Sequence, residues 1–181
     1  MADIEKKQYL VISALGSDRP GLVDQLSRTL FDSSCNIEDS RMAVLGGEFS
    51  LILLVSGDWN NIAKVEQQIP RLQQTLGLVM TSRRTEERAP QPNLLPYSID
   101  VVSIDHPGIV YHLANFLSRR QINIEDMTTS TYSAPHTGTP MFSVHMAIEI
   151  PADNPIATLR DEFLDFCDDF NLDAVMEPFK G

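Results

Sequence analysis

Apolar and polar residues alternate along the first half of the chain in a way that predicts a mixture of strands and helices. Strand-like runs, apolar or alternating, occupy residues 9–15, 36–45, 49–55 and 78–81. Apolar residues at three- and four-residue intervals predict helices over residues 22–30 and 62–72. Gly46 and Gly47 separate two of the strands and are typical of a tight hairpin. The predicted order is therefore strand, helix, strand, strand, helix, strand.

Polar residues and prolines indicate where the predicted helices begin and bend. Asp18 is a candidate cap for the first helix, and Pro20 suits its first turn. Asp58 or Asn60 is a candidate cap for the second helix. Pro70 falls inside the second helical pattern, so we expect it to kink or divide that segment.

The second half of the chain repeats the same order of elements. Its predicted strands and helices lie at residues 97–104, 109–117, 123–132, 141–150, 156–170 and 172–176. The fold class is therefore α+β, with two ferredoxin-like βαββαβ domains in tandem, each an antiparallel four-stranded sheet with its helices on one face. The second strand of this plan lies at a sheet edge. Copies can then pair edge to edge or through their helices, and the sequence leaves both open.

A repeated motif shows that the two halves derive from one unit. Residues 18–39 (DRPGLVDQLSRTLFDSSCNIED) align without a gap with residues 105–126 (DHPGIVYHLANFLSRRQINIED), and ten of 22 positions are identical. Between the copies, TEERAPQPNLLP at residues 85–96 contains three prolines and no hydrophobic period, which is typical of a linker. The predicted domains are residues 1–84 and 94–181, joined by a linker over 85–93.

The formal net charge of −11 is concentrated in the second half. Residues 1–92 hold 10 Lys or Arg and 12 Asp or Glu, whereas residues 93–181 hold 4 and 13. Such an acidic surface repels phosphate backbones and argues against direct nucleic-acid binding, although not against acting on DNA through another protein. The sequence shows neither an apolar leader nor a membrane-length apolar run, so we expect a cytoplasmic protein without a membrane partner.

The repeated residues fall in two segments whose chemistry suits a small zwitterion. The first is a helix start, at residues 18–21 and 105–108, where backbone N–H groups and the helix dipole attract a carboxylate. The aspartate of each segment can receive an ammonium group, and the glycine allows close approach. The second segment opens the following strand, where Asn36 or Asn123 offers an amide. The motif therefore suits a free amino acid, unless it serves only to start a helix and form a turn.

These motifs resemble the ACT domain, a regulatory module that often binds amino acids. The resemblance rests on a βαββαβ unit with DRPGL after its first strand and NIED opening its second. Over nearly its whole length the chain resembles the family of glycine cleavage system transcriptional repressors, in YLVISALGSDRPGLV, in CNIEDSRMAVLGGEFSLILLVSGDWNNI, in the Pro-rich linker and in the longer loop of the second copy. This resemblance implies repression of the glycine cleavage operon without a DNA-binding domain. It implies action through a LysR-type transcriptional activator, with glycine weakening that association and with no cofactor.

The resemblance also implies which residues contact the ligand, since ACT domains bind at these two segments, often across a domain interface. In the first copy they are Asp18, Arg19, Pro20, Gly21, Leu22, Asn36 and Ile37. In the second copy they are Asp105, His106, Pro107, Gly108, Ile109, Asn123 and Ile124. The second copy has His106 where the first has Arg19. The two sites are therefore expected to differ in affinity, or one is purely structural.

Two other functions remain open at this point. ACT modules also serve as stand-alone regulatory subunits of amino-acid metabolic enzymes. They also precede hydrolase domains, as in formyltetrahydrofolate deformylase, but the sequence has no residues beyond the second repeat for such a domain. We expect neither catalytic nor metal-binding residues, because no phosphate-binding glycine pattern and no His/Cys cluster occurs. The histidines His106, His112, His136 and His145 are scattered over the second half.

Two charged stretches are not explained by the repeated motif. Residues 82–88 hold a small basic cluster, which we interpret as a solvated strand end. Residues 161–169 carry five acidic side chains on the helix that also holds the apolar stripe of Phe163, Phe166 and Phe170. This acidic face is either simply solvated or a docking surface for a basic partner.

Overall fold

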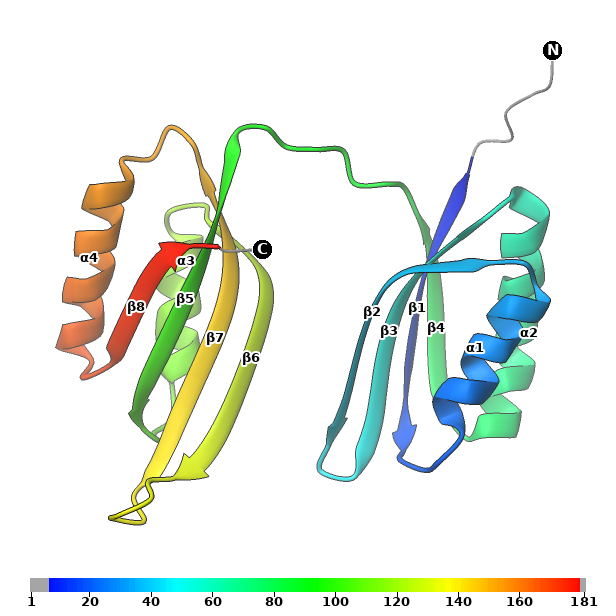
Figure 1. Cartoon of the computed structure of the whole chain (residues 1–181), viewed down its shortest axis with the longest axis horizontal. Coiled ribbons are helices and arrows are strands. Elements are labelled where there is room, and N and C mark those ends of the chain that lie inside the picture. The colour runs from blue at the N-terminus through cyan, green and yellow to red at the C-terminus, as the bar shows by residue number, and fades with distance from the viewer. Residues whose placement is uncertain (1–6, 180–181) are drawn as a thin grey trace. The chain divides into compact units, whose positions relative to one another are not determined.

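The chain folds into two compact units, one ending at Ala89 and the other beginning at Pro90. A computed structural model describes residues 7–179 (Figure 1). The two units are called the N-terminal and C-terminal domains below, and each is described by itself.

The N-terminal domain has the βαββαβ order that the sequence predicts. Its elements are β1 (Gln8–Ser17), α1 (Leu22–Asp32), β2 (Asn36–Leu45), β3 (Glu48–Gly57), α2 (Trp59–Leu76) and β4 (Val79–Thr85). The strands form one antiparallel sheet in the order β2-β3-β1-β4. Both helices cover the same face of this sheet, and no helix of this domain covers the other face (Figure 1). The expected edge position of the second strand is confirmed.

The C-terminal domain repeats this plan. Its elements are β5 (Leu94–Ile104), α3 (Ile109–Ser118), β6 (Asn123–Ser133), β7 (Pro140–Pro151), α4 (Ile156–Asp169) and β8 (Asp173–Pro178). The sheet order is β6-β7-β5-β8, again antiparallel throughout. The predicted fold class is therefore confirmed in both halves of the chain.

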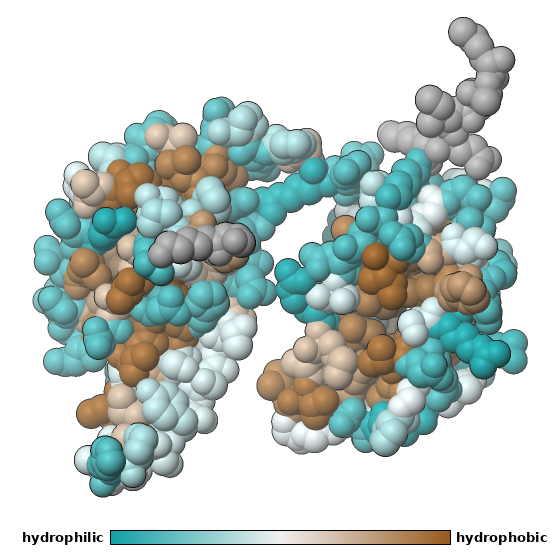
Figure 2. All heavy atoms as spheres, viewed as in Figure 1, coloured by the Kyte–Doolittle hydropathy of each residue, from teal (hydrophilic) through white to brown (hydrophobic). Residues whose placement is uncertain are grey.

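Each domain has its own core between the sheet and the helices. Alternate residues of the central strands point into it, as Leu10 and Val55 do in the N-terminal domain, where both are 0% exposed. The largest fully buried side chain of the C-terminal domain, Phe163 of α4, is likewise 0% exposed. The opposite sheet face keeps some apolar residues at the surface, and Figure 2 shows apolar patches interrupted by polar ones on the viewed side of each domain.

One expectation about a helix start is wrong, and of the two outcomes expected at Pro70, a kink or a break, the break does not occur. Asp18 does not cap α1, because the helix begins at Leu22 with Gly21 as its N-cap and without a side-chain cap; Pro20 accordingly precedes the helix. Pro70 does not divide α2, which runs unbroken through it. Buried side chains on both sides of the proline, Ile69 and Leu76, hold the helix against the sheet, so packing overrides the local preference.

The other turn predictions are confirmed. Asp58 caps α2, because its carboxylate accepts a hydrogen bond from the backbone N–H of Asn61 at 2.7 Å. Gly46 and Gly47 connect β2 to β3 with φ angles of 59° and 86°. Such positive φ angles at both central positions are those that a two-residue hairpin requires, and glycine adopts them without steric cost.

Candidate functional site

The turn between the first strand and the first helix has the same geometry in both domains. Gly21 and Gly108 precede α1 and α3 with φ angles of 90° and 99°, in the left-handed region that favours glycine. The backbone N–H of Asp18 donates to Gly47 at 3.1 Å, and that of Asp105 donates to Pro140 at 2.9 Å. These bonds hold each turn against the hairpin at the same end of its sheet.

In both domains the helix after the turn begins without a side-chain cap among the described residues. Neither Gly21 nor Gly108 has a side chain, and among residues 7–179 no side chain caps either helix. The backbone N–H groups of a first helical turn have no partner inside the helix, and they carry a partial positive charge. Both glycines are exposed. The two turns can therefore bind a carboxylate with backbone N–H groups.

A polar side chain that the sequence analysis missed lies over each turn. In the N-terminal domain, a Cβ built on Gly21 would be 3.5 Å from Nε2 of Gln25. In the C-terminal domain, a Cβ built on Gly108 would be 3.5 Å from Nε2 of His112. Gln25 and His112 are equivalent in the repeat, four residues after the glycine. The repeat alignment contained the signal: both copies place a hydrogen-bonding side chain there, but of different types.

Several of the expected ligand residues have structural partners within their own domain. Arg19 donates from Nη2 to the carbonyl oxygen of Leu76 at 3.1 Å, so its guanidinium binds the end of α2. Nδ1 of His106 lies 3.1 Å from the carbonyl oxygen of Pro107. Leu22 is 1% exposed and belongs to the core. Its counterpart Ile109 is buried in the same way, whereas Asp18, Pro20, Asp105 and Pro107 are all exposed.

The two asparagines open the edge strands and bind a neighbouring glutamate. Nδ2 of Asn36 donates to Oε1 of Glu38 at 3.2 Å, and Asn123 donates to Glu125 in the same way. In both strands the register shifts at this glutamate, which is the extra residue of a β-bulge. The repeated NIED motif therefore has a local structural role in each domain. Beside the asparagines, Ile37 is exposed and Ile124 half-buried.

Glu38 lies at the centre of a polar cluster at this end of the N-terminal sheet. It accepts hydrogen bonds from Nζ of Lys7 at 2.6 Å, from the hydroxyl of Ser56 and from Asn36. The hydrogen bond from Lys7, followed by those from Ser56 and Asn36, lowers the pKa of Glu38 to about 2. This carboxylate is therefore charged under all physiological conditions and is already bound by the protein's own groups.

The two segments lie at opposite ends of each sheet. Asn36 pairs with Ser56 at one end of β3, whereas the turn is bonded to Gly47 beside the other end. Eight residues of strand separate Glu48 from Ser56, or about 27 Å at the rise of an antiparallel strand. In the C-terminal domain, Asn123 pairs with Glu149 and the turn with Pro140. No single domain can therefore present both segments to one small ligand.

No metal site is found among the described residues, and His145 has a structural partner. Among residues 7–179 no group of three His, Cys, Asp or Glu side chains is arranged to hold a metal ion. His145 pairs with Asp100 across neighbouring strands, with Nδ1 and Oδ1 2.7 Å apart, on the exposed side of the sheet. The helices in the described part of the chain are all too short or too polar to cross a membrane.

The chain is similar in sequence to named transcriptional repressors. A family model described as the ACT domain matches residues 8–82. The "Glycine cleavage system transcriptional repressor" of Escherichia coli (strain K12) is 32% identical over 170 residues, which are 93% of this chain and 88% of that protein. The protein of the same name from Shigella flexneri is equally similar.

Two crystal structures match nearly the whole chain. One is of a protein assigned as a glycine cleavage system transcriptional repressor, with a TM-score of 0.70, 30% identity, and coverage of 97% of this chain and 99% of that one. The other is of a protein of unknown function from Galdieria sulphuraria, with a TM-score of 0.78, 28% identity, and coverage of 97% and 100%.

Proposed function

Since the chain belongs to the family of glycine cleavage system transcriptional repressors, which are tandem ACT-domain regulators rather than enzymes, we propose that glycine controls its activity. In this proposal the protein represses the glycine cleavage operon indirectly, by binding a LysR-type transcriptional activator. Glycine binds to the ACT domains and weakens that complex. Because the activator works at the operon, the proposed location is the cytoplasm.

The acidic charge of the protein supports an indirect route to DNA. The chain carries 25 acidic residues and 14 basic ones, so its net field repels a phosphate backbone. A repressor of this charge is therefore expected to reach its operon through another protein. The family membership supports a transcription factor as that protein, rather than a metabolic enzyme, which is the alternative partner for an isolated ACT protein.

The observation that carries the glycine proposal is the open helix start at Gly21 and its copy at Gly108. In this proposal the carboxylate of glycine accepts hydrogen bonds from the backbone N–H groups of the first helical turn. Its ammonium group binds the exposed aspartate of the same turn, Asp18 or Asp105. A ligand without a side chain suits a turn over which Gln25 or His112 already lies within contact distance.

The turns are proposed as the primary ligand contacts, and the asparagine segments as secondary ones. Asn36 and Asn123 are each bonded to a glutamate of their own strand, and each lies far from the turn of its own domain. Asp24 adds a negative charge in the first turn of α1, whereas α3 has no acidic residue in its first turn. We therefore propose that the turn at Gly108 binds the carboxylate more tightly than the turn at Gly21.

Calorimetry on the full chain tests the sensor. We expect glycine to bind and to raise the melting temperature by mass action, and alanine and leucine to bind progressively more weakly. The absence of any heat or thermal shift with millimolar glycine would contradict the proposed effector.

A pull-down of the LysR-type activator, with and without glycine, tests the partner. Binding to the operon DNA by this protein alone would contradict the indirect route.

A further inference from the structure

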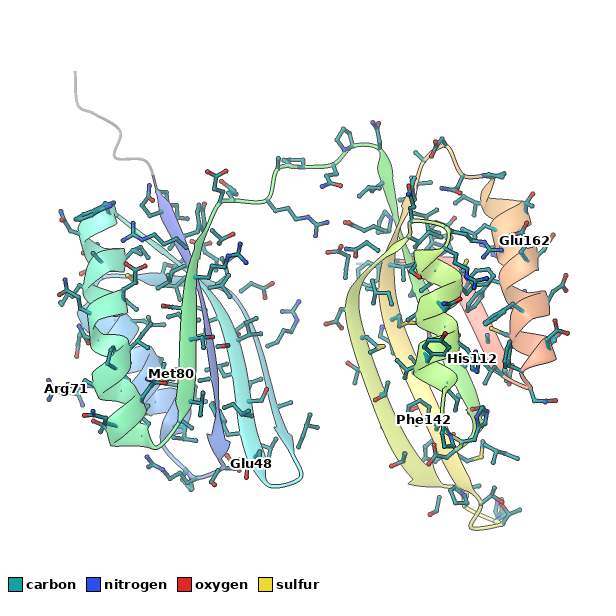
Figure 3. All side chains as sticks on the ribbon, turned by 180° about the vertical axis from the view of Figure 1, so that it is seen from behind. Glu48, Arg71, Met80, His112, Phe142 and Glu162 are labelled. Carbon is teal, nitrogen blue, oxygen red and sulfur yellow. The ribbon has the colours of Figure 1, made fainter. Side chains whose placement is uncertain are left out.

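A continuous row of aromatic side chains lies between α3 and α4 of the C-terminal domain. The ring of His112 stacks on Phe170 with 4.2 Å between centroids, and Phe170 contacts Phe166 at 4.9 Å. Phe166 in turn contacts Phe116 at 4.9 Å. The guanidinium of Arg120 closes the row, 3.7 Å above the ring of Phe116. Figure 3 shows His112 on α3 and Glu162 on α4 in the same helical layer.

The fold itself does not require this row. His112 and Phe116 of α3, and Arg120 just after its end, correspond in the repeat to Gln25, Thr29 and Ser33 of the N-terminal domain. Of those three polar side chains, Thr29 and Ser33 donate to helix carbonyl groups at 3.0 and 2.8 Å. The two domains share one topology but place different side chains at these positions. The shared topology alone therefore does not account for the aromatic row of the second copy.

Part of the row lines a groove formed by residues of α3, of α4 and of the turn after α3. The groove has a volume of about 390 Å³, and Phe116 and Phe166 contribute to its lining. Phe166 and Phe170 are half-buried, so part of their rings faces solvent. Aromatic and arginine side chains of this kind are the residues on which protein interfaces most depend.

Carboxylates of α4 line the same groove together with the guanidinium groups of Arg119 and Arg120, and the acidic side chains are in the majority. Asp165 and Asp169 are exposed and lie one helical turn apart along the groove, and Glu162 precedes them by one turn. Glu162 binds Nη2 of Arg120 at 2.8 Å, whereas Asp165 and Asp169 extend the acidic edge beyond this pair. The surrounding half of the chain, residues 93–181, has 13 acidic and 4 basic residues. A cationic partner is therefore complementary to this surface.

We propose that this α3–α4 groove is the docking surface for the partner protein, and that the partner contributes a basic segment with an apolar anchor. Its cations pair with Asp165 and Asp169, and its anchor packs on Phe166. The proposal rests on the proposed function, because a transcription factor carries such basic segments for its contacts with phosphates. A segment held in this groove is withheld from DNA, which gives repression without any DNA contact by this protein.

Charge reversal on the full chain tests the surface. In Asp165→Lys/Asp169→Lys the dissociation constant for the LysR-type activator is expected to rise at least about tenfold. The matched control is Asp153→Lys/Glu177→Lys, which makes the same change of charge at two exposed positions of the same domain outside α4. This control is expected to bind as the wild type does. The conservative variant Asp165→Glu/Asp169→Glu is expected to retain binding, and added salt is expected to weaken the wild-type complex.

Phe166→Leu tests the anchor, since it keeps an apolar side chain but removes the ring. It is expected to weaken binding about fivefold or more with little change in melting temperature. If the wild type binds the activator and both the lysine variant and Phe166→Leu bind equally well, the groove is not the docking surface and the proposed function stands. If the control loses as much affinity as Asp165→Lys/Asp169→Lys, only net charge matters and the groove is again excluded. If the wild type does not bind the activator, the proposed function and this surface both fail.

Discussion

The side-chain amide of Asn36 donates a hydrogen bond to the carboxylate of Glu38 at 3.2 Å, two residues further along the same edge strand. The pair recurs as Asn123 and Glu125 in the second domain. Both glutamates are the extra residue of a β-bulge. The asparagine and the glutamate of the repeated motif thus follow from one local structure, in which the amide holds the carboxylate of the bulged residue at the start of the edge strand.

Glu38→Gln is expected to destabilise the N-terminal domain in a pH-dependent manner. The pKa of Glu38 falls from 4.5 to about 2 on folding, because of hydrogen bonds from Lys7, Ser56 and Asn36. A lowered carboxyl pKa stabilises the folded state above the unfolded pKa, and this contribution is lost as pH falls through the folded pKa. Chemical unfolding is therefore expected to show a difference between wild type and variant at pH 7 that shrinks between pH 4.5 and about 2.

Lys7→Met is the companion variant, because Lys7 is the largest cause of the lowered pKa of Glu38. With Glu38 kept, Lys7→Met is expected to raise the pKa of Glu38 in the folded protein. The stability that this carboxylate contributes is then lost at higher pH. A difference between wild type and Glu38→Gln that stays constant from pH 7 to about 2 would show that the glutamate contributes shape rather than charge.

The order of elements, the edge strand and the glycine turns follow from the sequence because each depends on local chemistry. Apolar periodicity identifies the strands and helices, and a positive φ at Gly21 or Gly46 leaves few residue types available. Because the two copies align at an offset of 87 residues, the elements predicted in one domain also predict those of the other. These features need no knowledge of which residues meet in space.

Contacts between distant segments could not be predicted in this way. Asn36 and the turn at Gly21 are joined in the sequence argument by their repetition, yet strand pairing places them at opposite ends of the sheet. Arg19 reaches the end of α2, 57 residues away. The course of α2 through Pro70 depends on core packing, which local rules do not include.

Pro70→Ala is expected to stabilise the N-terminal domain. Pro70 lies inside α2 and is exposed, so it lacks the N–H that would otherwise bond to the carbonyl of Glu66. An alanine restores this bond without disturbing the core, with a gain of up to about 1–3 kcal/mol in the free energy of unfolding. Urea unfolding checks the sign, and a loss of stability would show that the proline is required for the shape of the helix. Gln67→Ala, at an exposed position of the same helix, is the control.

Gly108→Ala is expected to destabilise the C-terminal domain by about 1–2 kcal/mol, because Gly108 has a φ of 99° that a Cβ disfavours. Space is not the cause, since the new Cβ would lie 3.5 Å from His112, an ordinary contact distance. Gly108→Asn is expected to cost less, because asparagine tolerates the left-handed region better than alanine. Thermal unfolding of the two variants gives the comparison, and equal losses would point to a steric rather than a conformational cause.

Cys167 is expected to resist thiol reagents in the folded protein. Burial, followed by the nearby charge of Asp168, raises the pKa of its thiol to about 12, and the side chain is 1% exposed. In a Cys35→Ser background, labelling with a disulfide reagent at mildly alkaline pH is expected only after addition of denaturant. Cys35 is half-buried and serves as the internal comparison in the wild type, where it is expected to react first. Rapid labelling of native Cys167 would reveal opening of α4.

His112→Leu is expected to weaken glycine binding at the second turn if the side chain over Gly108 completes the ligand site. Its Nε2 lies within contact distance of the glycine position, and a leucine keeps apolar contact with Phe170 while removing the hydrogen-bonding nitrogen. One lost hydrogen bond corresponds to about 0.5–1.5 kcal/mol, or roughly a two- to twelvefold rise in the dissociation constant for glycine.

Gln25→Leu makes the same change at the first turn. Thr29→Ala, one helical turn further along α1, is the control that leaves the turn intact. Calorimetry with glycine separates the two sites, because each variant should reduce the affinity of one site only. If both leucine variants bind glycine as the wild type does, these side chains do not contact the ligand.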